Sequence, residues 1–170
     1  MAKSKNNKEQ KHIFSLLVEN QPGVLSRIAG LFSARGYNIE SLCVAPTTDP
    51  DVSRVSLVTK GDEFILEQIK KQLNKLINVI KVYDYTEVPY VQRDLALVKV
   101  RAKTENRAEI LRIVDIFRSR VVDVSPEYYT VEITGDEDKI EAFLRLLKPM
   151  GIKEIARTGP VALAREVQKL

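Results

Sequence analysis

Residues 13–32 decide the fold, because the hydrophobic period changes within them: the sequence reads IFSLLVENQPGVLSRIAGLF. The apolar run at 13–18 indicates a buried strand. Gln21-Pro22-Gly23 interrupts this run. Apolar side chains then recur at helical spacing on one face, at Val24, Leu25, Ile28, Leu31 and Phe32. The pattern predicts a strand, a short turn and an amphipathic helix.

The residues that follow complete one small unit. Gly36 ends the predicted helix, as glycine commonly does. Strands are predicted at 37–44 and 52–59, around a turn rich in Pro, Thr and Asp at 46–51. Gly61-Asp62 opens a second helix, and residues 79–85 supply a fourth strand. The predicted order is therefore strand, helix, strand, strand, helix, strand.

The same order then repeats in the second half of the chain. The predicted elements are a strand at 96–102, a helix at 106–120, strands at 121–125 and 128–134, a helix at 136–148 and a strand at 152–158. A shift of 85 residues places the first helix of one half on that of the other. It matches Leu25 with Ile110, Arg27 with Arg112, Ile28 with Ile113, Leu31 with Ile116, Phe32 with Phe117 and Arg35 with Arg120.

Two such repeats predict an α+β fold of two tandem ferredoxin-like βαββαβ domains. We expect a disordered basic tail at 1–11, a first domain at 12–86, a linker at 87–93, and a second domain with a C-terminal tail at 94–170. Each helix has one apolar side, so the helices should cover one face of each sheet. A unit of this size buries only ~60% of its unfolded surface, which favours pairing with a second copy.

Composition and charge restrict the class of protein. Residues 1–11 carry Lys3, Lys5, Lys8 and Lys11 against Glu9, a net charge of +3, which leaves only +1 for the rest of the chain. A nearly neutral body does not favour nucleic acid as a partner. No apolar run approaches the ~20 residues of a membrane helix. The N-terminus lacks a secretory signal, and a lone Cys43 cannot form an internal disulfide, so a cytoplasmic protein is expected.

The turn at 20–25 is the candidate binding site. It precedes a helix whose first N–H groups have no internal partner and lie at the positive end of the helix dipole, which suits a carboxylate. Gly23 lets a ligand approach the backbone closely. Asn20 and Asn38 offer donors and acceptors for the carboxylate and ammonium of a free amino acid. Pro-Gly before a helix is more commonly only a start signal, so the turn alone does not settle the matter.

The second half of the chain helps to choose between these interpretations. The shift of 85 places Glu105 at Asn20, Ala108 at Gly23 and Asp123 at Asn38. The fold signals therefore recur without the glycine and the neutral amides. Two acidic groups would repel a carboxylate, so the sequence predicts that only the first domain binds an amino acid.

These residues also carry a resemblance. A strand, Asn20-x-x-Gly23-x-Leu25 and a helix in a βαββαβ unit resemble the ACT domain, a module that binds amino-acid effectors. Longer motifs are similar to the small subunits of acetolactate synthase (acetohydroxyacid synthase), over roughly residues 12–168. They are Asn20-x-x-Gly23-x-Leu25-x-Arg27-x-x-x-Leu31-Phe32-x-x-Arg35-Gly36-Tyr37-Asn38-Ile39-x-Ser41-Leu42, Arg93-Asp94-Leu95-x-Leu97-x-Lys99-Val100, Ile113-Val114-x-Ile116-Phe117-Arg118 and Gly151-Ile152-x-Glu154-x-x-Arg157-Thr158-Gly159 with Ala162-Leu163-x-Arg165.

The resemblance implies a regulatory homodimer with no catalytic residues of its own. Such a subunit activates a separate catalytic subunit, which holds thiamine diphosphate, Mg²⁺ and FAD, and confers feedback inhibition by valine, leucine or isoleucine. Two N-terminal domains pair side by side with the effector between them. The positions that match the effector-binding motif are Asn20, Gly23, Val24, Leu25, Asn38 and Ile39.

Other functions are less well supported. His12 is the only histidine, which disfavours a metal site or a Cys-His nucleophile. An RNA-binding ferredoxin-like protein needs aromatic and basic residues on its exposed sheet face, where we expect the aliphatic Val18 and Val55. An acylphosphatase-like enzyme needs an arginine in the phosphate loop, and none precedes the helix. An ACT-domain sensor that regulates a different partner remains an alternative.

Overall fold

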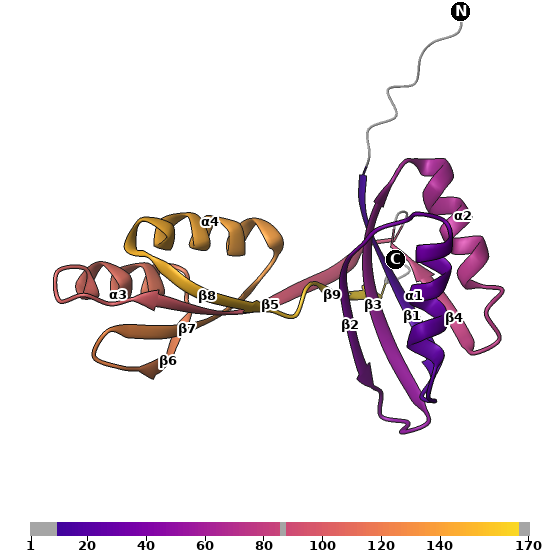
Figure 1. The fold of residues 1–170 in the computed structure, drawn as a ribbon, viewed down its shortest axis with the longest axis horizontal. Helices are drawn as coiled ribbons and strands as arrows, with labels where there is room; N and C mark the ends of the chain where they lie inside the picture. The colour runs from indigo at the N-terminus through magenta and orange to yellow at the C-terminus, as the bar shows by residue number, and fades with distance from the viewer. Residues whose placement is uncertain (1–9, 86–87, 167–170) are drawn as a thin grey trace, which may run out of the picture. The chain divides into compact units, whose positions relative to one another are not determined.

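The chain forms two compact units in the computed structural model, which describes residues 10–85 and 88–166 (Figure 1). The first unit contains the residues up to Val91 together with those from Ala162 onward, and the second is Gln92–Val161. Each unit is a single antiparallel sheet with two helices. The predicted α+β class with two βαββαβ units is confirmed. Most of the predicted basic tail lies outside the described residues.

The first unit has the sheet order β2-β3-β1-β4. Both helices lie on the same face of this sheet (Figure 1). Its elements are β1 (Gln10–Glu19), α1 (Val24–Ala34), β2 (Ile39–Pro46), β3 (Val52–Gly61), α2 (Glu63–Leu73) and β4 (Val79–Asp84). The alternation of the strands sends Phe14, Leu16 and Val18 into a core that Ile28 and Phe32 of α1 complete.

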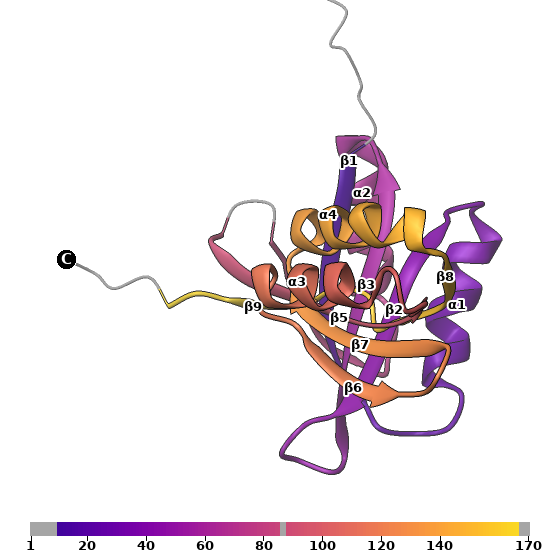
Figure 2. The same ribbon diagram turned by 90° about the vertical axis from the view of Figure 1, so that its left-hand side faces the viewer.

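The second unit repeats this arrangement with the order β6-β7-β5-β8. Figures 1 and 2 show both of its helices on one face of the sheet. Its elements are β5 (Tyr90–Arg101), α3 (Arg107–Ile116), β6 (Arg120–Val124), β7 (Tyr128–Gly135), α4 (Glu137–Leu147), a 3₁₀ turn (Lys148–Met150) and β8 (Ile152–Arg157). The second helix of each unit begins alike, because the side chains of Asp62 and Asp136 accept hydrogen bonds from the backbone N–H groups of Ile65 and Lys139.

The residues from Ala162 onward belong to the first unit. We expected them in the second domain, at 94–170. Strand β9 (Val161–Ala164) places Ala162, only 3% exposed, against Ile13, Val58 and Tyr85 on the face of the first sheet that the helices leave open. The Tyr85 hydroxyl donates a hydrogen bond to the Ala162 carbonyl at 3.0 Å. The linker expected at 87–93 is also shorter in the structure, because β5 already begins at Tyr90.

The strand pairings correct the predicted alignment of the two halves. Leu16 pairs with Val55 and Val82, and Val98 pairs with Val131 and Ile155. Leu16 and Val98 are therefore equivalent, which is a shift of 82 residues (98 minus 16) and not 85. The same shift matches buried helix residues with buried helix residues: Ile28 with Ile110, Leu31 with Ile113 and Phe32 with Val114. The shift of 85 placed the buried Leu31 on Ile116, which is 68% exposed.

No helix within residues 10–85 and 88–166 is long and apolar enough to cross a membrane. Over the same residues, no group of three or more His, Cys, Asp or Glu side chains is placed to hold a metal ion.

Candidate effector site

The turn between β1 and α1 has the backbone that a ligand site at a helix start requires. Gly23 caps α1 with φ 86° and ψ −12°, a left-handed conformation that residues with a side chain rarely adopt. A Cβ atom built on Gly23 meets nothing within 4 Å, so the space beside this residue is open. The first turn of α1 carries no acidic side chain. Both features suit an anion at this end of the helix.

Backbone donors in the first turn of α1 are unused within the part of the chain that the structure describes. Val24 donates to the Gln21 carbonyl at 3.4 Å, and Arg27 donates to the Gly23 carbonyl at 3.0 Å. Between them, the N–H groups of Leu25 and Ser26 have no acceptor among the residues that the structure describes. Unpaired N–H groups in the first turn are the donors that bind carboxylates and phosphates at helix N-termini.

Asn20 is fixed by the hairpin between β2 and β3. Its backbone N–H donates to the Asp51 carbonyl at 2.7 Å, and its side-chain Nδ2 donates to the Pro50 carbonyl at 2.8 Å. The hairpin in turn is held by the Asp51 N–H, which donates to Oδ1 of Asp49 at 3.0 Å. The bond to Pro50 uses one of the two N–H groups on Nδ2. Oδ1 of Asn20 is an acceptor, so it suits an ammonium group.

A second support for the turn was not predicted from the sequence. Asn78 lies in the loop before β4, is 8% exposed, and accepts a short hydrogen bond from Nη1 of Arg27 on α1. Its Nδ2 donates to Oε2 of Glu19 at 2.5 Å, and its carbonyl accepts from the Glu19 N–H at 3.0 Å. Asn78 therefore ties the end of β1 to the first turn of α1. The partners are far apart in sequence, and only the strand order brings them together.

Val24 and Leu25 have opposite environments. The Val24 side chain is 5% exposed and packs in the core of the first unit, so only its backbone faces the turn. The Leu25 side chain is 43% exposed. Leu25 can therefore offer an apolar surface to the side chain of a bound amino acid, whereas Val24 positions the helix.

Asn38 and Ile39 lie at the opposite end of the sheet from Asn20 in the same chain. Glu19, which precedes Asn20, pairs with Val52 of β3, and Ile39 pairs with Thr59. These partners are seven residues apart on β3 (59 minus 52), or about 23 Å at ~3.3 Å per residue. One chain therefore does not bring the two groups of predicted site residues together.

The second domain lacks both groups. The shift of 82 places Ala102 at Asn20 and Glu105 at Gly23, in place of the residues that the shift of 85 suggested. β6 is also shorter than β2. Its first residue, Arg120, pairs with Glu132 of β7, and the equivalent pair in the first sheet is Cys43 with Ser56 of β3. The start of β6 therefore corresponds to Cys43. Nothing in β6 corresponds to residues 39–42, the start of β2.

Val18 and Val55 do not lie on the exposed face of the sheet, where we expected them. Val18 and Val55 are 3% and 1% exposed and face the helices, not the open face of the sheet. On the open face, Arg54 and Lys81 lie over the ring of Tyr83, at 5.4 and 4.8 Å from its centroid. Tyr85 is buried beside β9. Tyr83, Arg54 and Lys81 therefore form an aromatic and basic group on this face.

The family of the chain follows from two matches. Residues 14–81 match the family described as the AHAS small subunit-like ACT domain. Residues 93–166 match the family described as the small subunit of acetolactate synthase. The chain belongs to the family of acetolactate synthase small subunits. The resemblance seen in the sequence is thereby confirmed, and with it the expectation that this is the small subunit and not the catalytic chain.

Relatives in archaea and bacteria cover nearly the whole chain. A probable acetolactate synthase small subunit from Methanothermobacter thermautotrophicus is 55% identical over 91% of this chain and 92% of its own. The small subunit of acetolactate synthase isozyme 3 from Salmonella typhimurium is 49% identical over 91% and 96%. The crystal structure of the small subunit from Thermotoga maritima superposes with a TM-score of 0.85, at 44% identity over 93% and 99%.

Proposed function

We propose that this chain is the regulatory subunit of acetolactate synthase, which activates the catalytic subunit and makes it sensitive to feedback inhibition by valine, leucine or isoleucine. The thiamine diphosphate, Mg²⁺ and FAD of the enzyme belong to the catalytic subunit in this proposal, and both proteins are cytoplasmic. The observation that carries it is the start of α1. There the N–H groups of Leu25 and Ser26 have no acceptor among the described residues, Asn20 is held by the neighbouring hairpin, and the Leu25 side chain is exposed.

The groups at this turn match the parts of a branched-chain amino acid. The N–H groups of Leu25 and Ser26 suit the carboxylate, and the helix dipole adds to their attraction. Oδ1 of Asn20 suits the ammonium group. The exposed Leu25 side chain suits an aliphatic side chain. The amide of Asn38 is the remaining polar group, and it must come from another chain.

A dimer through β2 would supply that chain. β2 is an edge strand, and its Val44 is 43% exposed. If two copies of β2 pair antiparallel, the Ile39 end of one strand lies beside the Pro46 end of the other. Pro46 pairs with Ser53, close to the hairpin that holds Asn20. Asn38 of one protomer would thus approach Asn20 of its partner, and the effector would lie between two first domains.

The direct test is calorimetric titration of the full chain with valine, leucine and isoleucine, alongside activity assays of the catalytic subunit with and without this chain. Gly23→Asp places a negative charge beside the carboxylate and should abolish effector binding. Gly23→Asn is the matched control, because asparagine tolerates the left-handed backbone better than other residues and adds no charge. Asn38→Ala should weaken binding ~10–100-fold, through loss of one charge-assisted contact.

The outcomes separate the parts of the proposal. If Gly23→Asp binds the amino acid as well as Gly23→Asn does, the carboxylate does not lie at the start of α1. If the chain binds the amino acid but never alters the catalytic subunit, it is a sensor for a different partner.

The dimer has its own matched pair of variants. Val44→Lys on β2 and Ile80→Lys on the opposite edge strand, β4, make the same change at exposed apolar residues. Sedimentation should show dimers for the wild type and Ile80→Lys, and monomers for Val44→Lys, because a lysine at an edge opposes strand pairing. A dimer that only Ile80→Lys dissociates would place the interface at β4 and leave the site incomplete.

A further inference from the structure

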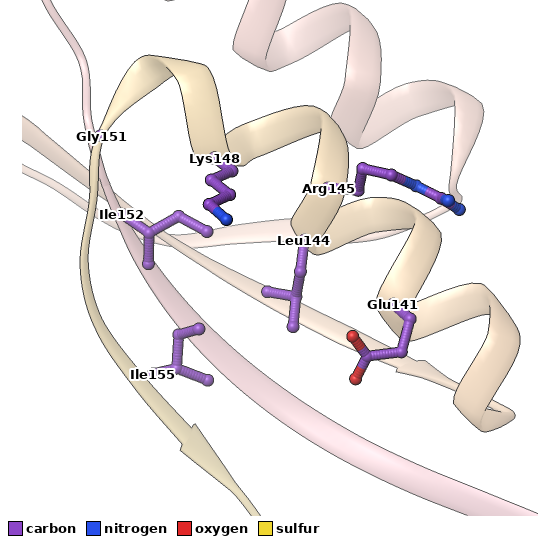
Figure 3. A pocket seen from close by; sticks show the side chains of 7 residues that line it. All are labelled: Glu141, Leu144, Arg145, Lys148, Gly151, Ile152 and Ile155. Carbon is purple, nitrogen blue, oxygen red and sulfur yellow. The ribbon is translucent and has the colours of Figure 1, made fainter.

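A groove lies between α4 and the edge strand β8 of the second domain (Figure 3). It measures about 650 Å³, and β8 is the last strand of its sheet in the order β6-β7-β5-β8. The residues that line it are Glu141, Leu144, Arg145, Lys148, Gly151, Ile152 and Ile155. Leu144 from the helix and the two isoleucines from the strand form an apolar floor. Ile155 is 42% exposed.

The first domain bridges the corresponding place with an ion pair. α2 and α4 are each 11 residues long after equivalent aspartate caps, which makes Lys70 the counterpart of Leu144. Phe14 pairs with Leu57 and Asp84, and Ala96 pairs with Ile133 and Arg157, which makes Asp84 the counterpart of Arg157. Nζ of Lys70 lies 3.0 Å from Oδ2 of Asp84 and so joins the helix to the edge strand.

The second domain keeps neither residue of that pair and joins its helix to its edge strand through a different pair, Glu141 and Arg157. Leu144 replaces the lysine and turns the position apolar. Arg157 replaces the aspartate and contacts Glu141 at 2.7 Å and Asp94 at 2.5 Å. The negative charge of Glu141, the one acidic group that lines the groove, is thus balanced by an arginine.

The rim of the groove is positive. Arg145 and Lys148 are exposed and have no ion-pair partner among residues 10–85 and 88–166. Figure 3 shows the Lys148 side chain reaching toward Ile152 and Arg145 extending outward from α4. An apolar floor with unpaired cations at its rim is complementary to an extended segment that carries both apolar and acidic side chains.

The edge strand adds a means of binding the backbone of such a segment. β8 pairs with β5 on one side only, so on its other side it offers N–H and C=O groups to a new strand. A strand added there would lay alternate side chains on the helix-covered face, into the groove, because successive side chains point to opposite faces.

We propose that the groove between α4 and β8 docks an apolar, acidic segment of the catalytic subunit as an added strand. This inference rests on the proposed function, since it names the place where the second domain contacts that partner. It also accounts for why the second domain keeps a complete core although it lacks the effector site. The first domain would bind the effector, and the second would hold the partner.

The test measures the affinity of the full chain for purified catalytic subunit by titration calorimetry. Arg145→Glu with Lys148→Glu reverses the rim, and Ile155→Asp puts a charge on the floor; each should weaken binding at least about tenfold. The control is Lys71→Glu with Lys75→Glu, a reversal of two positive charges at the end of α2 and just beyond it in the first domain. The control should bind the catalytic subunit within about threefold of the wild type.

Valine titration of each variant, with sedimentation, distinguishes the possible failures. The groove variants should keep wild-type valine affinity and self-association. If they bind the catalytic subunit as tightly as the wild type, the docking site is elsewhere and the proposed regulatory function stands. If they lose self-association instead, the groove receives a second copy of this chain and the inference is overturned. If the wild type itself does not bind the catalytic subunit, both proposals fall.

Discussion

Arg157 pairs with the buried carboxylate of Asp94 through two donors, Nε at 3.0 Å and Nη2 at 2.5 Å from the same oxygen, Oδ2. The hydroxyl of Thr158 donates to the other oxygen at 3.2 Å. Asp94 is only 2% exposed. Burial lowers the pKa of Arg157, but hydrogen bonds to Asp94 and Glu141 and their negative charges together raise it above its usual value. Residues from two separate sequence motifs thus join β5 to β8.

The first prediction follows from this pair. Arg157→Ala removes both donors and leaves a buried carboxylate without its cation, so it should destabilise the second domain by about 3 kcal/mol. Urea unfolding followed by circular dichroism measures the loss. Arg112→Ala is the control, because Arg112 makes an exposed ion pair with Glu109 at 3.2 Å and should change stability by less than ~1 kcal/mol. Equal losses of stability in the two variants would show that the buried Arg157–Asp94 pair stabilises the domain no more than an exposed ion pair does.

The second prediction compares two glycines that precede equivalent helix caps. A Cβ atom on Gly61 would lie 2.7 Å from Cγ2 of Ile65, and one on Gly135 would lie 2.6 Å from Cδ of Lys139. Isoleucine in a helix is nearly confined to one χ1 rotamer, whereas the lysine chain can move aside. Gly61→Ala should therefore cost about 1–3 kcal/mol, and Gly135→Ala clearly less. Thermal unfolding of both variants measures the two losses of stability. A larger loss for Gly135→Ala than for Gly61→Ala would show that the lysine side chain does not move aside.

The sequence predicted the element order because period and turn residues are local signals. It identified the turn at 20–25 for the same reason, since Gly23 and the helix start are adjacent. It misplaced the second copy by three residues (85 minus 82), because short helices with apolar residues at both i+3 and i+4 match in more than one register. Only the strand pairings, such as Leu16 with Val55, fixed the register.

The support of the candidate site could not be predicted in the same way. Asn78 contacts Glu19 and Arg27 because β4 lies beside β1 in the sheet. In the sequence, Glu19 is 59 positions from Asn78 and Arg27 is 51 positions from it. The paired charge of Asp94 and the burial of Ala162 also depend on tertiary contacts. The position of Asn38 is a further case, since its distance from Asn20 follows from the strand length and not from any local pattern.

The third prediction concerns Asn78 as a positioning residue. Asn78→Ala removes the link between Glu19 and the first turn of α1, so the turn at 20–25 should loosen and the affinity for the amino acid should fall about 3–10-fold. The lost buried hydrogen bonds should also cost about 1–3 kcal/mol of stability. Asn74→Ala is the control, because Nδ2 of Asn74 bonds only to the Lys70 carbonyl at an exposed position. Unchanged calorimetric titrations for Asn78→Ala would remove Asn78 from the site.

The last prediction concerns β9, which makes the first domain depend on the end of the chain. Ala162 fills a place between Ile13, Val58 and Tyr85, whereas its neighbour Leu163 is 58% exposed. Ala162→Asp would bury a charge there and should destabilise the first domain by more than about 2 kcal/mol. Leu163→Asp makes a similar change on the exposed side of the strand and should be nearly neutral. Urea unfolding of the full chain compares the two variants.

The same contact decides how the first domain can be isolated. A fragment that ends at Tyr90 lacks β9 and the hydrogen bond from the Arg165 N–H to the Pro89 carbonyl at 2.8 Å. It leaves apolar side chains on the open face of the sheet exposed, so it should be less stable and more prone to aggregate. A second fragment, with residues 1–91 joined to 161–170 through a short glycine linker, contains β9 and should bury these apolar side chains again. The joined fragment should unfold at a higher urea concentration than the truncated one and should bind the amino acid as the full chain does. If both fragments unfold at the same concentration, β9 is not a structural part of the first domain, and its burial in the full chain adds nothing to that domain's stability.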